Sequence, residues 1–156
     1  MDIFSKEMLY SSDGGGTPFV RPNLSSNGTL GGNAFAVTAN ASPPNAYKAV
    51  DGSASTVWSA YSSATYTFYN PTPLNVTKVL IKCYDRNRSI SSATIQGSND
   101  NSSWTTISSS YSLNGNTYVG TLTLNNNAFY KYYILSLTPY NSTIYLSELE
   151  IEAKER

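Results

Sequence analysis

Alternation of acidic and apolar residues near the C-terminus constrains the fold of this chain more than any other feature. From Ile144 to Ala153 the chain reads IYLSELEIEA. A period of two places successive side chains on opposite faces of a β-strand. One face then carries Glu148, Glu150 and Glu152, and the other carries Leu149 and Ile151. The segment therefore predicts a strand with one face in a hydrophobic core and the other in solvent.

Other segments with strand character follow one another at short spacing, separated by clusters of Gly, Pro and Asn. They are Ala64–Tyr69, Val76–Tyr84, Ala93–Gly97, Ser103–Ile107, Thr117–Leu124 and Tyr130–Thr138. We expect residues 70–73, with their two prolines, to end the first of them. The mostly apolar run Val76–Tyr84 predicts a central strand that is covered on both sides.

No window shows a helical period, so we expect an all-β protein, an antiparallel β-sandwich of jelly-roll type. Along the predicted strands, apolar residues recur on one face and supply its core. The expected core includes Trp58, Phe68, Val79, Ile81, Trp104, Tyr133, Leu135, Leu149 and Ile151.

Charge and cysteine content exclude several classes of function. Lys and Arg number 10, as do Asp and Glu, so no net positive field attracts nucleic acid. No segment approaches the roughly 20 apolar residues of a membrane helix, and MDIFSKEMLY at the start is not a signal peptide. The single cysteine, Cys83, rules out an internal disulfide.

The distribution of acids and bases argues against an enzyme. Histidine is absent, and between residues 14 and 147 the only carboxylates are Asp51, Asp85 and Asp100. General acid–base catalysis needs a positioned proton carrier, and glycoside hydrolysis needs two carboxylates that face one bond. We therefore expect a binding protein without catalytic residues.

The segment Asn45–Ser59, NAYKAVDGSASTVWS, combines a tight-turn signal with a concentration of oxygen ligands. Asp51 and Gly52 predict a turn, because glycine accepts positive φ and aspartate can bond its own backbone. The Asp51 carboxylate, the Ser53 and Thr56 hydroxyls and the carbonyls of the turn suit a hard cation. The alternative is an ordinary turn that Trp58 closes against the core.

The pattern KAVDGSASTVW, followed about ninety residues later by SELEIE, resembles the coagulation factor V/VIII C-type domain. That group, also called discoidin-like, includes galactose-binding carbohydrate modules. Ile95–Trp104, IQGSNDNSSW, is similar to a hairpin of the same family, with Asn101 in place of the usual glycine. The resemblance implies a galactose-binding-domain-like sandwich over residues 22–156. Residues 1–21 are expected to form a flexible arm or anchor, because SSDGGGTP cannot hold regular structure.

The resemblance also implies a structural Ca²⁺ in the loop around Asp51. Carried over residue by residue, its ligands are carbonyl, hydroxyl or carboxylate oxygens of Lys48, Asp51, Ser53, Thr56, Ser147 and Glu148. Whether the ion is Ca²⁺ or Na⁺ stays open, because both accept oxygen ligands.

Sugar-binding relatives have an arginine after the central strand and an aromatic residue in the loop before the last one. The corresponding residues here are Arg86, or Arg88 in its place, together with Tyr140 and the neighbouring Tyr61. An arginine fork can bond two hydroxyls at once. The relatives' histidine is missing, and the alternatives are a solvated or Asp85-paired arginine and a tyrosine that only packs its loop.

These features favour a non-catalytic glycan-binding module. PFVRPNLSSNGTLGG resembles a segment that often precedes this domain in bacteriophage tail and appendage proteins. A virion or extracellular location explains the missing signal peptide, and the arm would bind other virion proteins. The alternatives are a decoration or fibre subunit that binds only protein, and a module of a secreted bacterial enzyme or adhesin. A homo-oligomer stays open.

Overall fold

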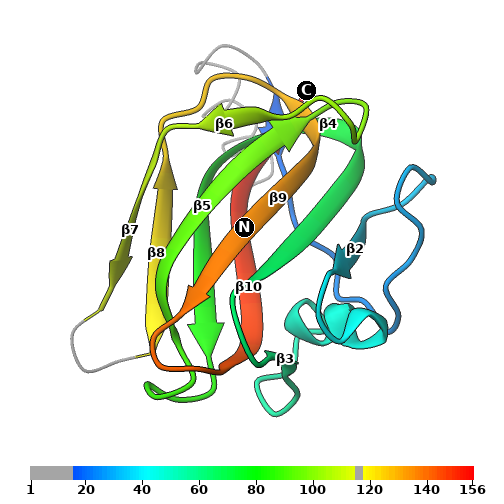
Figure 1. Cartoon of the computed structure of the whole chain (residues 1–156). Coiled ribbons are helices and arrows are strands. Elements are labelled where there is room, and N and C mark those ends of the chain that lie inside the picture. Colours follow the sequence, from blue (N-terminus) through cyan, green and yellow to red (C-terminus); the bar gives the residue numbers. More distant parts are fainter. Residues whose placement is uncertain (1–15, 115–117) are drawn as a thin grey trace, which may run out of the picture.

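A computed structural model describes residues 16–114 and 118–156 and confirms the antiparallel β-sandwich. Figure 1 labels most of its strands. The strands are β1 (Thr17–Pro18), β2 (Ala36–Ala39), β3 (Trp58–Ala60), β4 (Ala64–Cys83), β5 (Ile90–Ser98), β6 (Thr105–Ile107), β7 (Ser109–Leu113), β8 (Val119–Leu124), β9 (Tyr130–Pro139) and β10 (Ile144–Glu155). The described residues contain one helical element, the 3-10 helix η1 (Pro43–Ala49), which the sequence did not predict. None of their helices is long and apolar enough to cross a membrane.

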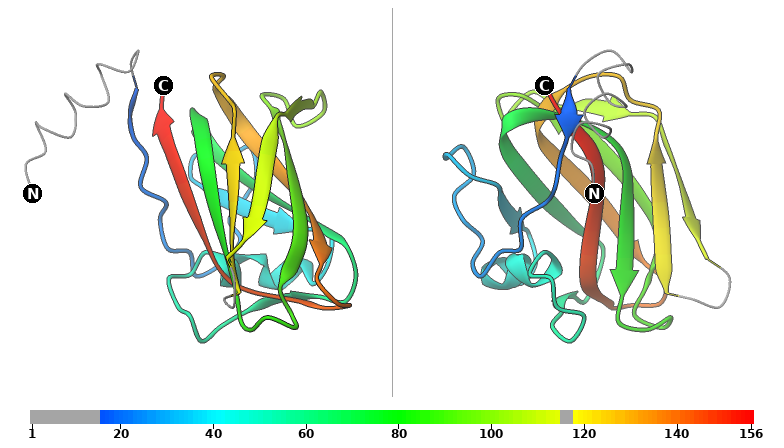
Figure 2. Two further views of the ribbon diagram at one scale, coloured as in Figure 1. Left: turned by 90° about the vertical axis from the view of Figure 1, so that its left-hand side faces the viewer. Right: turned by 180° about the vertical axis from the view of Figure 1, so that it is seen from behind.

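The long strand β4 belongs to both layers of the sandwich. Its first part pairs with β2 and β9, and the layer continues from β9 to β5 and β6. Its second part pairs with β10 and β8, with β7 beyond β8 and with β1 and β3 on the other edge of β10. Figure 2 shows the two layers packed face to face.

The expected break at residues 70–73 is wrong, because β4 is a single strand of 20 residues that runs through them. Its pairing with β9 shifts register between Tyr69 and Leu74, where the two prolines lie. Proline has no N–H to donate to a neighbouring strand. It is tolerated at such an irregularity because the ladder requires no hydrogen bond there. The expectation that residues 76–84 are covered on both sides is also wrong. Val79 and Ile81 are buried, whereas Lys78 and Lys82 lie on a partly open face.

The predicted core is confirmed except at Trp104. Trp58, Phe68 and Tyr133 are fully buried, and Phe68 stacks on Tyr133 with ring centroids 5.3 Å apart. Trp104 is only half-buried, because β6 begins at Thr105 and leaves the tryptophan in the preceding loop. Asn101 in that loop has φ 60°, as the substitution for glycine predicts.

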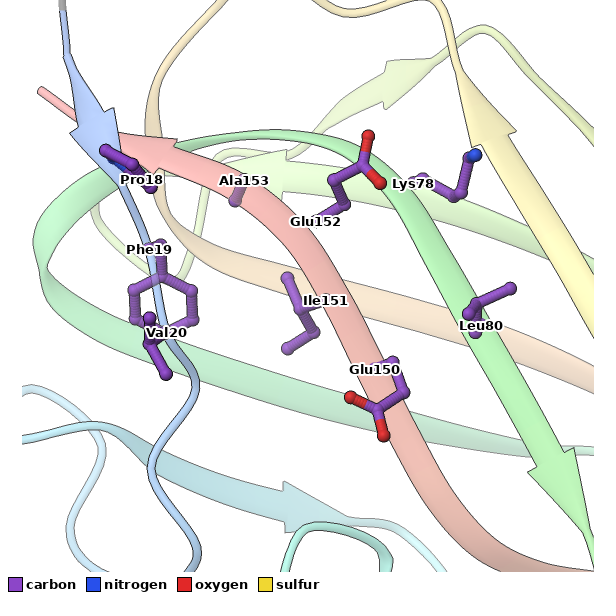
Figure 3. Close-up of a pocket in the computed structure, with 9 residues that line it drawn as sticks. All are labelled: Pro18, Phe19, Val20, Lys78, Leu80, Glu150, Ile151, Glu152 and Ala153. Atoms are coloured by element: carbon purple, nitrogen blue, oxygen red, sulfur yellow. The ribbon is translucent and has the colours of Figure 1, made fainter. Parts of the chain in front are cut away.

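The predicted faces of the last strand are confirmed except at Glu148, which is buried under the turn at Gly52. Leu149 and Ile151 are buried in the core, and Glu150 and Glu152 are exposed. Figure 3 shows the open side of this strand, where a pocket of about 250 Å³ lies between β10, β4 and the segment at Phe19.

The described part of the expected arm, residues 16–21, lies along the sandwich. Thr17 pairs with Glu155, and the Phe19 N–H donates to the Ala153 carbonyl at 2.9 Å. Phe19 is 9% exposed and packs on Phe35, with ring centroids 5.9 Å apart. These residues therefore contribute to the fold, while residues 1–15 lie outside the described part of the chain.

Candidate functional site

The turn after η1 brings oxygen atoms of three predicted ligands together. Asp51 accepts a hydrogen bond from the Ser53 N–H at 2.9 Å with one carboxylate oxygen. The Thr56 hydroxyl donates to the other oxygen and lies 3.4 Å from the Ser53 carbonyl. Gly52 has φ 79°, so a residue with positive φ closes the turn as the sequence predicts.

Glu148 joins this turn to the last strand. Its Oε1 accepts the Gly52 N–H at 2.9 Å, and its Oε2 lies 2.7 Å from an Arg21 nitrogen. Burial raises the pKa of Glu148, while the neighbouring Arg21 charge and the Gly52 N–H oppose that rise. Arg21 also donates to the Val50 carbonyl at 2.7 Å, so its guanidinium bridges the turn and β10.

The donor chemistry around Asp51 fits a hard cation, because carboxylate, hydroxyl and carbonyl oxygens lie within hydrogen-bond reach of one another. Glu148 would join such an ion only by exchanging its present partners. The Ser147 hydroxyl donates to the Lys82 carbonyl at 2.9 Å, and Lys48 lies in the last turn of η1. The described residues contain no cluster of three His, Cys, Asp or Glu side chains, so any ion here needs hydroxyl and carbonyl oxygens in addition to carboxylates.

The predicted ligand residues Arg86 and Tyr140 meet at one end of the sandwich. The Arg86 guanidinium carbon lies 5.2 Å from the centre of the Tyr140 ring. Two contacts tie their loops together: the Tyr140 N–H donates to the Ser89 carbonyl at 2.9 Å, and the Asn141 side chain donates to the Asn87 carbonyl at 3.4 Å. The structure therefore places a cation and an aromatic ring side by side at this end.

Arg88 has a different environment from Arg86. Its guanidinium bonds the Asp85 carboxylate and lies between two rings, 5.0 Å from the centre of Tyr84 and 4.5 Å from that of Tyr145. The hydrogen bonds from Arg88 hold the pKa of Asp85 below its usual value. The alternative of an arginine paired with Asp85 thus describes Arg88, and its contacts make it a support for the two tyrosines.

Exposed tyrosines gather at the same end. Among the described residues, the exposed large apolar side chains are Val20, Tyr61, Tyr84, Tyr118 and Tyr140. Tyr61 follows β3, Tyr84 follows β4, Tyr118 precedes β8 and Tyr140 lies between β9 and β10. Figure 1 shows that these strand ends and loops lie at the lower end of the sandwich. Sequence reasoning missed Tyr84 and Tyr118, because it placed both inside predicted strands, whereas β4 ends at Cys83 and β8 begins at Val119.

A comparison with family models matches residues 32–148 to the F5/8 type C domain. The match spans β2 to the first half of β10 and includes the loops with Tyr61, Arg86 and Tyr140. Among curated proteins, no sequence matches the chain significantly.

Solved structures share the fold of this chain. CpGH89CBM32-5 from Clostridium perfringens, in complex with GalNAc-β-1,3-galactose, superposes with a TM-score of 0.64 at 17% identity, covering 77% of this chain and 94% of that one. The CBM32 of AlyQ, in complex with 4,5-unsaturated mannuronic acid, gives 0.62 at 26% identity over 74% and 92%. An F5/8 type C domain from Bacteroides fragilis gives 0.63 at 13% identity over 79% and 93%.

Proposed function

This chain belongs to the F5/8 type C domain family, and from that membership we propose that it is a non-catalytic carbohydrate-binding module. The observation that carries the proposal is the distribution of exposed aromatic rings. Of the five exposed large apolar side chains in the described residues, four are tyrosines, and all four lie at the end that carries Arg86. Two of the structural relatives were solved with sugars bound.

The chemistry of this end suits sugars. A pyranose ring offers a weakly apolar face that an exposed tyrosine can cover, and its hydroxyls can accept hydrogen bonds from the Arg86 fork. A shallow surface buries little area and displaces well-bonded water, so binding should be weak, in the millimolar to micromolar range. Many copies on one particle or one enzyme would compensate through effective concentration.

Two carriers of such a module are open, a bacteriophage particle and a bacterial enzyme. We favour the virion, where the module would attach to bacterial or host surface glycans and the segment before Gly16 would contact other virion proteins. The resemblance of residues 18–32 to a segment of phage tail proteins supports this reading. One relative, however, is AlyQ with its CBM32 and alginate lyase domains, and this observation favours the enzyme-borne module.

A structural Ca²⁺ is a further part of the proposal. The clustered oxygens of Asp51, Ser53 and Thr56 support it. The carbonyls of Lys48 and Ser147 and the carboxylate of Glu148 would complete the ligand set that the family resemblance implies. The ion would stabilise the junction between the turn and β10.

The test of glycan binding is an array of bacterial and animal glycans probed with a multivalent display of the wild type. Arg86→Ala and Tyr140→Ala should each lose most of the signal while their melting temperatures stay at the wild-type value. Val20→Ala is the matched control, because Val20 is 78% exposed and lies beside the pocket of Figure 3. A multivalent wild type that binds no glycan on the array would favour the protein-binding decoration subunit instead.

A further inference from the structure

The order of strands at the tyrosine end points to an extended binding surface. We propose that Tyr61, Tyr140, Tyr84 and Tyr118 form a row that takes a linear oligosaccharide chain of several units, in contrast to a single terminal sugar. This inference rests on the proposed function and names the class of glycan that the same site would bind.

Strand register sets the order of the row. β3 pairs with the start of β10 through Ala60 and Ile144. Tyr61, which follows β3, therefore lies beside the loop of Tyr140, which leads into β10. The Tyr84 N–H donates to the Tyr145 carbonyl at 2.8 Å, which places the end of β4 next to β10. The Cys83 N–H donates to the Tyr118 carbonyl at 3.1 Å, which places the start of β8 next to β4.

The row therefore crosses the strand ends in the order β3, β10, β4, β8. Figure 2 shows the ends of β10, β4 and β8 side by side in the view from behind. Neighbouring strands lie about 4.8 Å apart, so the three intervals from β3 to β8 span about 14 Å. That length exceeds the width of one pyranose ring, and a single sugar could contact only part of the row.

Fixed side chains in the middle of the row favour a ligand that contacts several rings. Arg88 lies between Tyr84 and Tyr145, and Asp85 accepts hydrogen bonds from both the Arg88 backbone at 2.9 Å and its guanidinium. Next to Tyr84 in the row is Tyr140, and Arg86 lies over its ring. Rings held in place before binding lose less conformational entropy when a ligand covers them, so each additional sugar adds affinity at a lower cost.

The test is titration of the whole chain with galacto-oligosaccharides and with mannuronate oligosaccharides, each from the monosaccharide to the tetrasaccharide. The expected result is an affinity that rises with chain length in at least one series. Tyr118→Ala should weaken tetrasaccharide binding by about fivefold, the equivalent of one aromatic contact, and leave the shortest bound ligand unaffected. Tyr140→Ala should weaken binding at every length.

Tyr118→Phe keeps the ring and should restore tetrasaccharide affinity, while Val20→Ala is the control for loss of an exposed apolar side chain elsewhere. Equal affinity for all lengths, or a Tyr118→Ala variant that binds the tetrasaccharide like the wild type, overturns this inference and leaves the proposed function standing. A wild type that binds neither series at any length also overturns it, and the glycan array then decides the proposed function separately.

Discussion

Arg21 and Glu148 form an ion pair of 2.7 Å across 127 residues of sequence. Only 7% of the Arg21 side chain and 9% of the Glu148 side chain are exposed. The Arg21 Nε, also buried, has no hydrogen-bond partner among the described residues. The pair joins the first described segment to the last strand, at the turn where a cation was predicted.

Removing one member of this pair should strongly destabilise the fold. Arg21→Met or Glu148→Gln leaves a buried charge without its counter-charge, at a cost of about 3–5 kcal/mol in the free energy of unfolding. The double variant should recover part of that loss. Urea unfolding of the four proteins measures the coupling between the two sites.

Lys82 and Glu150 provide the matched control, because their side chains are 42% and 49% exposed and 3.5 Å apart. Their coupling energy should be about 0–1 kcal/mol, as for other exposed pairs. Equal coupling energies for both pairs would contradict a special role for Arg21.

Calcium should stabilise the folded state through the turn at Asp51. An ion that binds only the folded protein adds on the order of 3 kcal/mol at a hundredfold excess over its dissociation constant. A chelator should lower the melting temperature and added Ca²⁺ restore it, and Asp51→Ala should abolish that difference. Asp100→Ala removes another turn carboxylate, which accepts the Ser102 and Ser103 N–H groups, and should keep the Ca²⁺ response.

Calcium binding also has an expected structural consequence at Arg21. If Glu148 becomes an ion ligand, its contact with Arg21 must change, so the Arg21–Glu148 coupling energy should fall when Ca²⁺ is present. Melting curves that are indifferent to chelator and to added Ca²⁺ in both the wild type and Asp51→Ala would count against the ion.

Alkaline pH should unfold the protein through its buried tyrosines. Burial raises the pKa of Tyr133 to about 12, whereas an exposed tyrosine titrates near 10. The contribution of Tyr133 to stability is therefore complete below pH 10 and is lost as the pH rises through 12. Burial also raises the pKa of Tyr66 and that of Cys83, the latter to about 12, and both act in the same direction.

Tyr133→Phe separates the ionisation of this residue from its packing. The hydroxyl donates to the Leu74 carbonyl at 2.6 Å, so its loss should cost about 1 kcal/mol at neutral pH. Between pH 10 and 12, however, the stability of the variant should fall less steeply than that of the wild type. Parallel pH profiles of urea unfolding would show that Tyr133 does not titrate as described.

Gly120 allows the Tyr111 ring to cross strand β8. The Tyr111 hydroxyl donates to the Ile90 carbonyl at 2.9 Å, and a Cβ at position 120 would collide with that ring. Gly120→Ala should therefore destabilise the fold by about 1–3 kcal/mol, as other overpacked sites do. In a Tyr111→Ala background the same substitution should cost much less, and guanidinium unfolding of the four proteins would show the difference.

Local rules predicted the last strand well and the longest strand poorly. The alternation of β10 is visible in its own residues, and its buried face is confirmed. The continuity of β4 depends on its partners: β9 pairs with it before the proline segment and again at Leu74, and β10 and β8 pair with it after that segment. Proline signals alone could not show that the chain stays extended between these pairings.

In the candidate site, too, some residues could be predicted from local sequence and others depend on long-range contacts. Arg86 and Tyr140 lie in loops that the family resemblance identified, and the structure brings them together. Tyr118 joins the row only because β8 is a neighbour of β4, a long-range pairing that no local pattern predicts. Arg21 was assigned to a flexible arm, and its burial depends on Glu148, a residue far away in the sequence.

The pairing of Thr17 with Glu155 places the first and last described strands side by side at one end of the domain. Chain entry and exit share one pole of the sandwich, and the row of tyrosines occupies the other, where β10 begins. The first and last described segments of the chain therefore leave the tyrosine end uncovered.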